Sequence, residues 1–477
     1  MRLKAIETAA ICRGRLRQGR AEERLGEIGT DSRTIKPGQC FLALKGERFD
    51  GHSFLHKVVQ KGASALIVED RRGLSLPREV PVIVVPDTLI ALGDLAASWR
   101  RRFSIPVIAV TGSTGKSTTK EMIAYILAGR FRVLKNEGNL NNLIGLPLSL
   151  LKLRPSHQAA VLELGMNRPG EIARLTEIAQ PDVGLITNVG PVHLLGLGDL
   201  PGVALAKGEL AKGLGPETWA VVNLDDARVR KLWARHRGLK IGFSRRPREG
   251  RGFEETVHLA AFRPVMKNGW PGIEFALQLE KSGRYFGRPV EFSLESLAWH
   301  NLENALAAAA AGRALGVPLA EAARRLRGFQ GLKARSQLLK LSGRVRLVDD
   351  SYNANPVSML SALRSFNYWR GRSRAWVVLG DMLELGRQAE TEHRRLGRAL
   401  GEMGFDRLIF RGEFSRLLAR TANRAGVSAG QIRVAKSNGE IVAWLAQELK
   451  PGDWVLVKGS HGVHLEEVVA GLQKERG

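Results

Sequence analysis

The sequence predicts an α/β protein with three domains, and three observations lead to this prediction. The chain is 477 residues long, and about 150 residues per domain corresponds to three hydrophobic cores. Its composition, 44% hydrophobic and 25% charged, is that of an ordinary folded protein. From Ile105 onward, apolar strand-like runs alternate with helical segments, as they do in parallel sheets. We therefore expect domains at residues 1–102, 103–330 and 331–477.

The first domain is expected to be the smallest, with mixed α/β structure. Residues 40–44, 65–69 and 80–85 are short β-like runs, and turn clusters such as "KPGQ" and "GERFDGH" separate them. The segment 88–103 is helical in character and has arginines in its last turn, where positive charge suits the helix dipole. This helix would close the first domain.

The second and third domains both show the alternation of a parallel sheet. In the central domain the expected strands cover 106–112, 159–165, 183–190 and 218–226, and the expected helices cover 116–129, 170–179, 300–316 and 319–329. In the last domain the strands cover 345–352, 373–382, 406–412 and 453–460, with a helix over 391–404 between them. We expect a central parallel-sheet ATPase domain followed by a Rossmann-like C-terminal domain.

The composition excludes several classes of protein. Cys12 and Cys40 are too few for a disulfide scaffold and lack metal-site spacing, so we expect small buried hydrophobes. The N-terminus makes a poor secretory signal, and the longest apolar run is interrupted by Arg313 before it could cross a bilayer. We expect a cytoplasmic monomer without membrane insertion.

The formal charge of +26 is the one extreme value. A basic protein can bind nucleic acid, a membrane surface or a phosphorylated small molecule. Lysine and arginine are spread along the whole chain, however, and the densest basic segment, residues 228–251, has no clear platform of stacking aromatics. We therefore favour a solvated basic surface over nucleic-acid binding, which remains the alternative from another functional class.

The stretch "VIAVTGSTGKSTTKEM", residues 107–122, predicts a phosphate loop. An apolar strand precedes a loop of glycines and hydroxyls, and a helical segment follows, which is the context such a loop requires. Gly112 and Gly115 would let the backbone approach phosphates, and the helix N-terminus would face the anion. Lys116 would neutralise phosphate charge, and Ser117 or Thr118 could hold Mg²⁺. The nucleotide-binding residues expected in this loop are Thr111, Gly112, Ser113, Thr114, Gly115, Lys116, Ser117 and Thr118.

Two residues after neighbouring strands could complete a metal site. Glu163 ends an apolar strand, and parallel strands deliver such residues to the edge of the sheet where the phosphate loop lies. His193 also follows a strand; it is either a second metal ligand or a structural or surface histidine.

These segments together resemble the Mur ligases, the ATP-dependent amide-forming enzymes of bacterial cell-wall synthesis. The resemblance runs through the chain in order, in "DSRTIKPGQCFLALKGERFDGHSF", "KNEGNLNNLIGLPLSLL", "LELGMNRPGEI" and "HNLENALAAAAA". In the last domain, "YNANP" and "GDMLELG" are most similar to the member that joins D-alanyl-D-alanine to UDP-N-acetylmuramoyl-tripeptide. The resemblance thus implies this ligase reaction through an acyl phosphate, with ATP and Mg²⁺.

The resemblance also implies roles for particular residues. The residues expected to act in catalysis and metal binding are Lys116, Ser117, Glu163, His193 and Lys207. Lys207 matches a lysine that is thought to carry a carbamate in this family; the alternative is that Lys207 is an ordinary helical lysine. The nucleotide would further contact His300, Asn301, Asn304, Arg335 and Asp350. The uridine diphosphate end of the substrate would be held by Ser32, Arg33, Asp50 and His52. Asn139, Asn141 and Asn142 would line the muropeptide, and Tyr352, Asn353 and Asn355 would face the dipeptide.

Two positions depart from the family pattern. Ala334 stands where a glycine is expected, and His461 stands where an arginine is usual. A neutral imidazole cannot replace a guanidinium fork, so the role of His461 stays open. Within the enzyme class, the alternatives are a tripeptide-forming ligase and a folylpolyglutamate or cyanophycin type synthetase.

Overall fold

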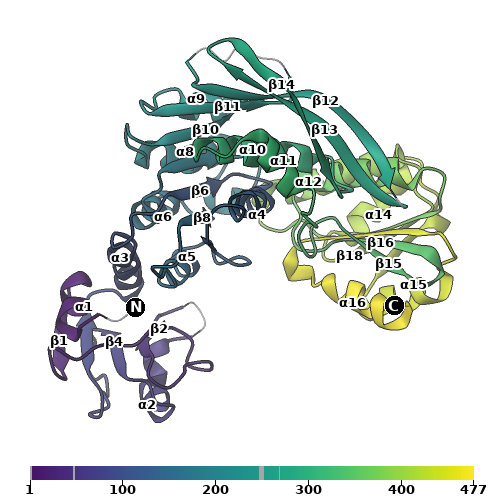
Figure 1. The fold of residues 1–477 in the computed structure, drawn as a ribbon. Helices are drawn as coiled ribbons and strands as arrows, with labels where there is room; N and C mark the ends of the chain where they lie inside the picture. The colour runs from purple at the N-terminus through teal and green to yellow at the C-terminus, as the bar shows by residue number, and fades with distance from the viewer. Residues whose placement is uncertain (1–2, 47–48, 247–251, 268, 477) are drawn as a thin grey trace.

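The fold consists of three β-sheets in sequence order, each covered by helices (Figure 1). The computed structural model describes residues 3–46, 49–246, 252–267 and 269–476. Parts of two segments discussed above, 47–48 and 247–251, lie outside the described residues. The mixed α/β architecture of three domains is confirmed. None of the helices in the described ranges combines the length and apolarity needed to cross a bilayer.

The first sheet has five strands in the order β1-β5-β4-β3-β2, and only β1 is antiparallel to its neighbour. Its buried strands carry Cys40, and Cys12 lies in the same core, so both cysteines are buried as expected. The elements are α1 (Ala5–Ile11), β1 (Arg15–Gln18), β2 (Ile28–Gly29), β3 (Cys40–Leu42), the 3₁₀ helix η1 (Gly51–Phe54), α2 (Leu55–Gln60), β4 (Ala65–Glu69), β5 (Val82–Val85) and α3 (Thr88–Arg100).

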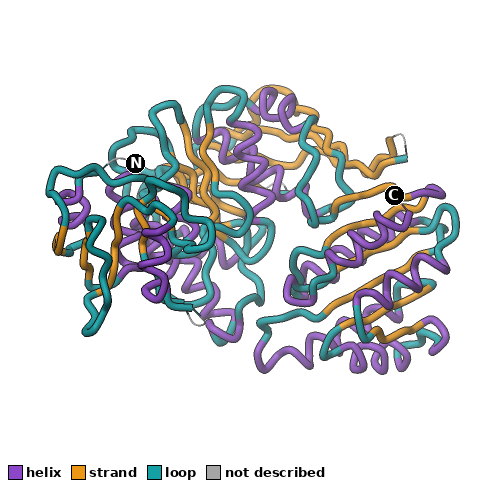
Figure 2. The backbone as a smooth tube through the Cα atoms, turned by 90° about the horizontal axis from the view of Figure 1, so that it is seen from below, coloured by secondary structure: helices purple, strands orange, loops and turns teal. Residues whose placement is uncertain are grey.

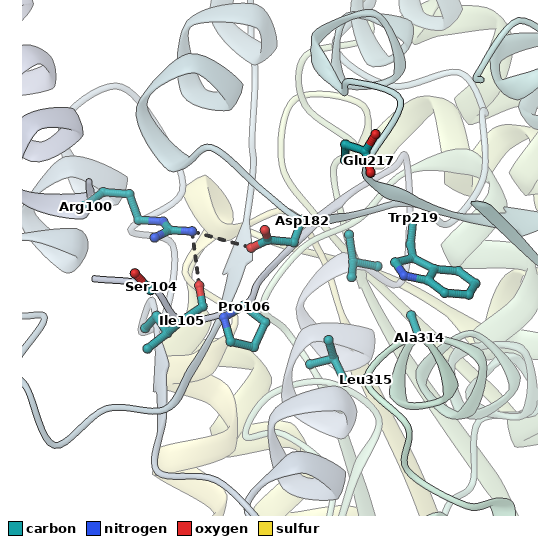
Figure 3. Close-up of a pocket in the computed structure, with 10 residues that line it drawn as sticks. Arg100, Ser104, Ile105, Pro106, Asp182, Glu217, Trp219, Ala314 and Leu315 are labelled. Atoms are coloured by element: carbon teal, nitrogen blue, oxygen red, sulfur yellow. Dashed lines mark hydrogen bonds and ion pairs between the residues drawn. The ribbon is translucent and has the colours of Figure 1, made fainter. Parts of the chain in front are cut away.

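Helix α3 joins the first sheet to the second. Its apolar side belongs to one core that runs from residues of the first domain into the central domain. At its last residue, the Arg100 guanidinium donates to the carbonyls of Ala179, Phe103 and Ile105 at 3.1, 2.6 and 3.1 Å. Figure 3 shows its contacts with Ile105 and with the Asp182 carboxylate. Burial lowers the pKa of Arg100, which lines a cavity of about 400 Å³ at the amino-terminal ends of β6, β9 and β10. The arginine therefore fastens the linker to the central domain.

The central sheet has nine strands in the order β14-β13-β12-β11-β10-β9-β6-β8-β7. Strands β6 to β12 are parallel, while β13 and β14 are antiparallel and were not predicted. The elements are β6 (Val107–Thr111), α4 (Lys116–Leu127), β7 (Val133–Lys135), α5 (Gly145–Leu150), β8 (Ala159–Glu163), α6 (Glu171–Ala179), β9 (Val183–Ile186), α7 (Leu194–Leu197), α8 (Leu200–Gly213), β10 (Trp219–Asn223), α9 (Ala227–Trp233), β11 (Leu239–Ser244), β12 (Glu255–Lys267), β13 (Trp270–Lys281), β14 (Arg284–Leu294), α10 (His300–Ala314) and α11 (Leu319–Leu326).

The alanine-rich helix α10 covers one face of this sheet. Residues Ala305–Ala311 are buried and pack against α4 and the strands, since small side chains allow close approach of the backbones. Helices α3, α5, α6 and α8 contribute to the core on the other face.

The third sheet has six strands in the order β15-β16-β20-β17-β18-β19, parallel except for β15, with helices on both faces (Figure 2). This is the predicted open, mostly parallel sheet. The elements are β15 (Gln337–Leu341), β16 (Val345–Asp350), α12 (Pro356–Arg370), β17 (Ala375–Gly380), the 3₁₀ helix η3 (Gly386–Gln388), α13 (Ala389–Gly401), β18 (Arg407–Arg411), α14 (Ser415–Arg424), β19 (Ile432–Ala435), α15 (Asn438–Glu448), β20 (Trp454–Lys458) and α16 (Glu466–Arg476).

Candidate active site

The phosphate loop joins the buried strand β6 to the N-terminus of α4. Both glycines are required by their surroundings. A Cβ on Gly112 would lie 1.9 Å from the Thr187 hydroxyl, and one on Gly115, where φ is +77°, would lie 2.3 Å from the Asn304 amide oxygen. The loop is therefore pressed against β9 and α10, and its shape depends on side chains far away in the sequence.

Lys116 is held in an arched conformation over this loop. Its Nζ donates to the Gly112 carbonyl at 2.9 Å. Burial lowers the pKa of Lys116, while the charge of Glu163 partly offsets that effect. An anion bound in the loop would restore the balance of charge around this buried amine.

Ser117 and Glu163 meet as the sequence predicts. The Ser117 hydroxyl donates to one carboxylate oxygen of Glu163 at 2.5 Å, and the Asn141 amide donates to the other at 2.7 Å. Asn136, which is fully buried, fixes the backbone of Glu163 by donating to its carbonyl and accepting from its N–H. The end of β8 is thereby positioned beside the start of α4.

Lys207 on α8 belongs to the same charged group. The lysine is 1% exposed, and burial lowers its pKa well below the ordinary value. The positive charge of Lys116 lowers this pKa further, and Glu163 opposes the shift. Burial therefore favours the neutral, nucleophilic form of this amine over the charged form.

His193 lies at the contact between the central and C-terminal domains. Its backbone has φ of +53°, and its Nδ1 is 2.7 Å from a carboxylate oxygen of Glu384. Glu384 follows β17, and the contact with His193 lowers the pKa of this carboxyl. His193 thus meets a carboxylate that the sequence analysis did not single out.

Arg335 crosses from the C-terminal domain to the phosphate loop. Its Nη2 donates to the Ser117 hydroxyl at 3.0 Å, and its guanidinium lies 4.2 Å from the centre of the Tyr352 ring. Tyr352 in turn stacks on His461, with ring centres 6.2 Å apart. Ala334 and His461, the two positions that depart from the family pattern, therefore both lie beside this contact between Arg335, Tyr352 and the phosphate loop. The backbone of Ala334 has φ of +57°.

Asp350 forms a buried pair that the sequence did not reveal. One carboxylate oxygen accepts from the Ser336 N–H at 2.9 Å, and the other lies 2.7 Å from Lys458 Nζ. Lys458 is 2% exposed and also donates to the Asn353 carbonyl at 2.9 Å. His300 lies in the field of this pair, and burial lowers the pKa of its imidazole.

The asparagines near the site are engaged with one another or with the backbone. Asn304 donates to the Asn301 side chain at 2.9 Å and accepts from Thr119 at 3.3 Å. Asn355 caps α12 by accepting from the Ser358 N–H at 2.9 Å. Two more of the predicted asparagines bind nearby backbone: Asn353 accepts from the Ala354 N–H, and Asn142 accepts from the Gly145 N–H. Asn139 is exposed.

The four residues predicted for the uridine end fall into two pairs in the first domain. Ser32 and Arg33 lie on the loop before β3, and Arg33 forms an exposed ion pair with Asp31. Asp50 lies 2.7 Å from His52 Nδ1, and the other ring nitrogen accepts from the Glu69 N–H at 2.9 Å. Arg71, which the sequence analysis missed, contacts Asp50.

Asn188 is another residue that the sequence analysis missed. Its side-chain oxygen accepts from the Thr114 N–H at 3.0 Å and its amide donates to the Thr114 hydroxyl at 2.9 Å. The Ser113 hydroxyl donates to the Gly190 carbonyl at 2.9 Å, and the Thr111 hydroxyl donates to the Leu164 carbonyl. The motif "TNVG" after β9 was the available signal, because it follows a strand next to β6.

The oxygen donors at the loop suit Mg²⁺ more than a transition metal. Across the described ranges, no three histidine, cysteine, aspartate or glutamate side chains come together as metal ligands. The Ser117 hydroxyl and the Glu163 carboxylate do meet, and Mg²⁺ is commonly held by one or two carboxylates together with substrate phosphates.

This arrangement defines a phosphate-loop α/β protein in which a second domain closes on the loop. The chain belongs to the Mur ligase family. Residues 110–312 match the Mur ligase middle domain, residues 334–461 match the Mur ligase glutamate ligase domain, and residues 24–100 match the Mur ligase family catalytic domain.

Particular relatives extend over nearly the whole chain. The UDP-N-acetylmuramoyl-tripeptide–D-alanyl-D-alanine ligase of Escherichia coli strain K12 is 35% identical and covers 95% of both chains. The enzyme of the same name from Bacillus subtilis strain 168 is 34% identical over 93% of this chain and 92% of its own. A crystal structure of MurF from Acinetobacter baumannii is similar at a TM-score of 0.84, with 33% identity and 99% of both chains covered. MurF from Thermotoga maritima, solved with ADP, has a TM-score of 0.78 at 30% identity, covering 94% of this chain and 97% of its own.

Proposed function

We propose that the protein uses ATP to join D-alanyl-D-alanine to the terminal carboxylate of UDP-N-acetylmuramoyl-tripeptide. The observation that carries the proposal is the near full-length similarity to ligases of that name. The meeting of Ser117, Glu163 and Arg335 at the phosphate loop supports it, because such a group can clamp a transferring phosphoryl.

The first half-reaction would activate the carboxylate. A carboxylate oxygen attacks the γ-phosphorus of ATP, the bond from that phosphorus to the β,γ-bridging oxygen breaks, and ADP leaves. The products of this step are an acyl phosphate and ADP. Lys116 and the N-terminus of α4 would stabilise the charge on the equatorial oxygens, and Arg335 would approach from the C-terminal domain. His300, Asn301, Asn304 and Asp350 would bind the nucleoside.

Mg²⁺ would be held by Ser117 and Glu163, with His193 as a further ligand. When bound, it neutralises phosphate charge during the transfer. Ser117 and Glu163 lie next to each other, and the contact of His193 Nδ1 with Glu384 leaves Nε2 as the ring nitrogen that would bind the metal.

The second half-reaction would form the amide. The amine of D-alanyl-D-alanine attacks the acyl carbon, the C–O bond to phosphate breaks, and the amine loses a proton. Tyr352, Asn353 and Asn355 would face the dipeptide. A cavity of about 420 Å³ lies at the carboxyl ends of β17 and β18; none of these three residues lines it, and the buried Arg411 Nε at its wall has no hydrogen-bond partner in the described ranges. Closure of the two domains would keep water from the acyl phosphate.

The first domain would hold the UDP end through Ser32, Arg33, Asp50 and His52, and Asn139, Asn141 and Asn142 would line the muropeptide. We assign these roles to residues 1–102 and the neighbouring central segment. We propose that the protein acts in the cytoplasm, where ATP and nucleotide-linked precursors are found, and that it acts as a monomer.

Phosphate release tests the proposal directly. We expect release from ATP with UDP-N-acetylmuramoyl-tripeptide to depend on added D-alanyl-D-alanine, because the acyl phosphate turns over only when an amine accepts it. A glutamate or lysine acceptor in place of the dipeptide serves as the control for the other ligases. Release that is independent of the dipeptide would refute the assignment.

We also propose that Lys207 carries a carbamate. Burial and the charge of Lys116 lower the pKa of this amine and so favour its neutral form, which can attack CO₂ and release one proton; the product is a buried carbamate anion. With ¹³C-bicarbonate, we expect one carbamate carbon signal that disappears in Lys207→Met. A matched change of the exposed lysine Lys212→Met should keep the signal, and a signal that persists in Lys207→Met would refute the assignment.

A further inference from the structure

A basic edge of the central sheet lies outside the site described above. It consists of Arg235, Arg237, Lys240, Lys281, Arg284 and Arg288, together with three exposed apolar residues, Leu239, Tyr285 and Phe286. Tyr285 and Phe286 are 60% and 63% exposed, and a group of exposed apolar residues can mark an interaction site.

Strand pairing brings these residues together. Lys240 at the start of β11 accepts from the Glu254 N–H at 2.9 Å, and Glu255 then pairs with Lys281 at the end of β13. Lys281 pairs in register with Arg284 at the start of β14. Residues 235–240, which are part of the densest basic segment, therefore lie at an edge where the fold supplies exposed aromatic residues.

The charges on this edge are mostly unneutralised. Lys281 pairs with Glu255, and its Nζ lies 5.5 Å from the Phe286 ring. In the described part of the chain, none of the other five basic side chains lies within ion-pair distance of a carboxylate. Glu254, beside Lys240, and Glu217, in the segment that contacts Gly238, are exposed acidic residues near this edge. Glu280, the cross-strand partner of Tyr285, is instead buried against His258 at 2.7 Å.

The edge faces away from the proposed active site. Lys281 is in register with Glu255, which pairs with Ile241 near the start of β11, so the edge lies at the amino-terminal ends of the parallel strands. The phosphate loop lies at their carboxyl ends. At the other end of the 12-residue strand β13, about 36 Å away, Trp270 contacts Lys340 of the C-terminal domain.

We propose that this basic edge docks the protein on an anionic phospholipid surface. Arginine and lysine are attracted to acidic headgroups, and aromatic rings settle at the level of those headgroups. Tyr285 and Phe286 follow the β13–β14 turn directly, at the start of β14, so an end-on approach would bring both rings to the interface. The active-site side of the sheet would then face away from the bilayer and stay open to substrates.

Two other kinds of partner fit the edge less well. Single-stranded nucleic acid stacks on rings that share one face, whereas Tyr285 and Phe286 are consecutive and point to opposite faces of β14. A second copy could pair along the outermost strand β14, but Pro289 lacks an N–H and Gly287 has φ of +70°, which interrupts the extended backbone.

Sedimentation with vesicles tests the proposal. The full-length protein should bind vesicles of equal parts phosphatidylcholine and phosphatidylglycerol, but not pure phosphatidylcholine, and salt should release it as the Debye length falls from about 14 to 4 Å. Arg284→Glu with Arg288→Glu should weaken binding at least about 25-fold, because each basic residue near an anionic surface contributes about fivefold. Phe286→Ser should weaken it several-fold.

A matched reversal on another surface is the control. Arg416 and Arg420 lie exposed on α14 of the C-terminal domain, which contacts the opposite end of β13 from the basic edge. Arg416→Glu with Arg420→Glu should therefore leave vesicle binding within about twofold. All variants should keep their thermal unfolding temperature and their phosphate release without vesicles. Absence of wild-type binding, or equal losses in both pairs, would overturn the proposal. So would binding to single-stranded DNA that Phe286→Ser abolishes, in the absence of vesicle binding.

Discussion

Replacing Lys116 with alanine should lower phosphate release by about 10³-fold or more while the protein stays folded. The amine lies over the phosphate loop and donates to the Gly112 carbonyl, so it is placed to stabilise charge on a transferring phosphoryl. Removal of one such group typically costs 10²- to 10³-fold, and the charge of lysine adds to that effect. Burial already lowers the pKa of Lys116, so its loss should not weaken the fold.

The measurement is steady-state phosphate release at saturating ATP, with thermal unfolding as the test of the fold. Lys212→Ala removes an exposed lysine from α8 and should leave the rate unchanged. If Lys116→Ala keeps more than about a tenth of the wild-type rate, the loop does not act on phosphate in the way that electrostatic stabilisation requires.

The phosphate loop could be predicted because its determinants are local. A buried strand, two glycines and a helix N-terminus specify the geometry around Lys116, and the structure has β6 and α4 at that place. The contact of Ser117 with Glu163 could also be predicted, since neighbouring parallel strands bring their carboxyl ends to one edge. The contacts of the loop with Thr187 and Asn304 could not be predicted, because they depend on how β9 and α10 pack against the loop.

The antiparallel extension of the central sheet was missed for a different reason. Strands β12 to β14 have 11 to 13 residues, twice the usual length, and much of β14 is exposed. Polar residues such as Arg263 and Glu274 pair across strands there, which removes the clear alternation of buried and exposed positions. The basic edge also escaped prediction, because it depends on the register that places Lys281 beside Arg284.

The buried position of Lys458 depends on the lateral order of the strands in the third sheet. In the sequence it ends an apolar run and could be taken for an exposed residue. The structure inserts β20 between β16 and β17, which puts Lys458 in register with Asp350 and buries both residues. Sequence patterns give strands but not their lateral order, so this pair could not be predicted.

Replacing Lys458 with methionine should destabilise the C-terminal domain by about 3–5 kcal/mol, because it leaves the Asp350 carboxylate buried without its partner. The same change removes the hydrogen bond to the Asn353 carbonyl. Urea denaturation gives the free energy of unfolding, and hydrogen exchange of the β16 and β20 amides shows whether the loss is local to the pair.

A double variant separates the unpaired charge from the loss of packing. Asp350→Asn together with Lys458→Met removes both charges, so it should be less destabilising than Lys458→Met alone, as expected when an uncompensated carboxylate causes most of the loss. Lys450→Met, at an exposed position before β20, should change the stability by less than about 0.5 kcal/mol. If the double variant is as unstable as the single one, the destabilisation comes from the missing contacts of the lysine and not from the buried charge of Asp350.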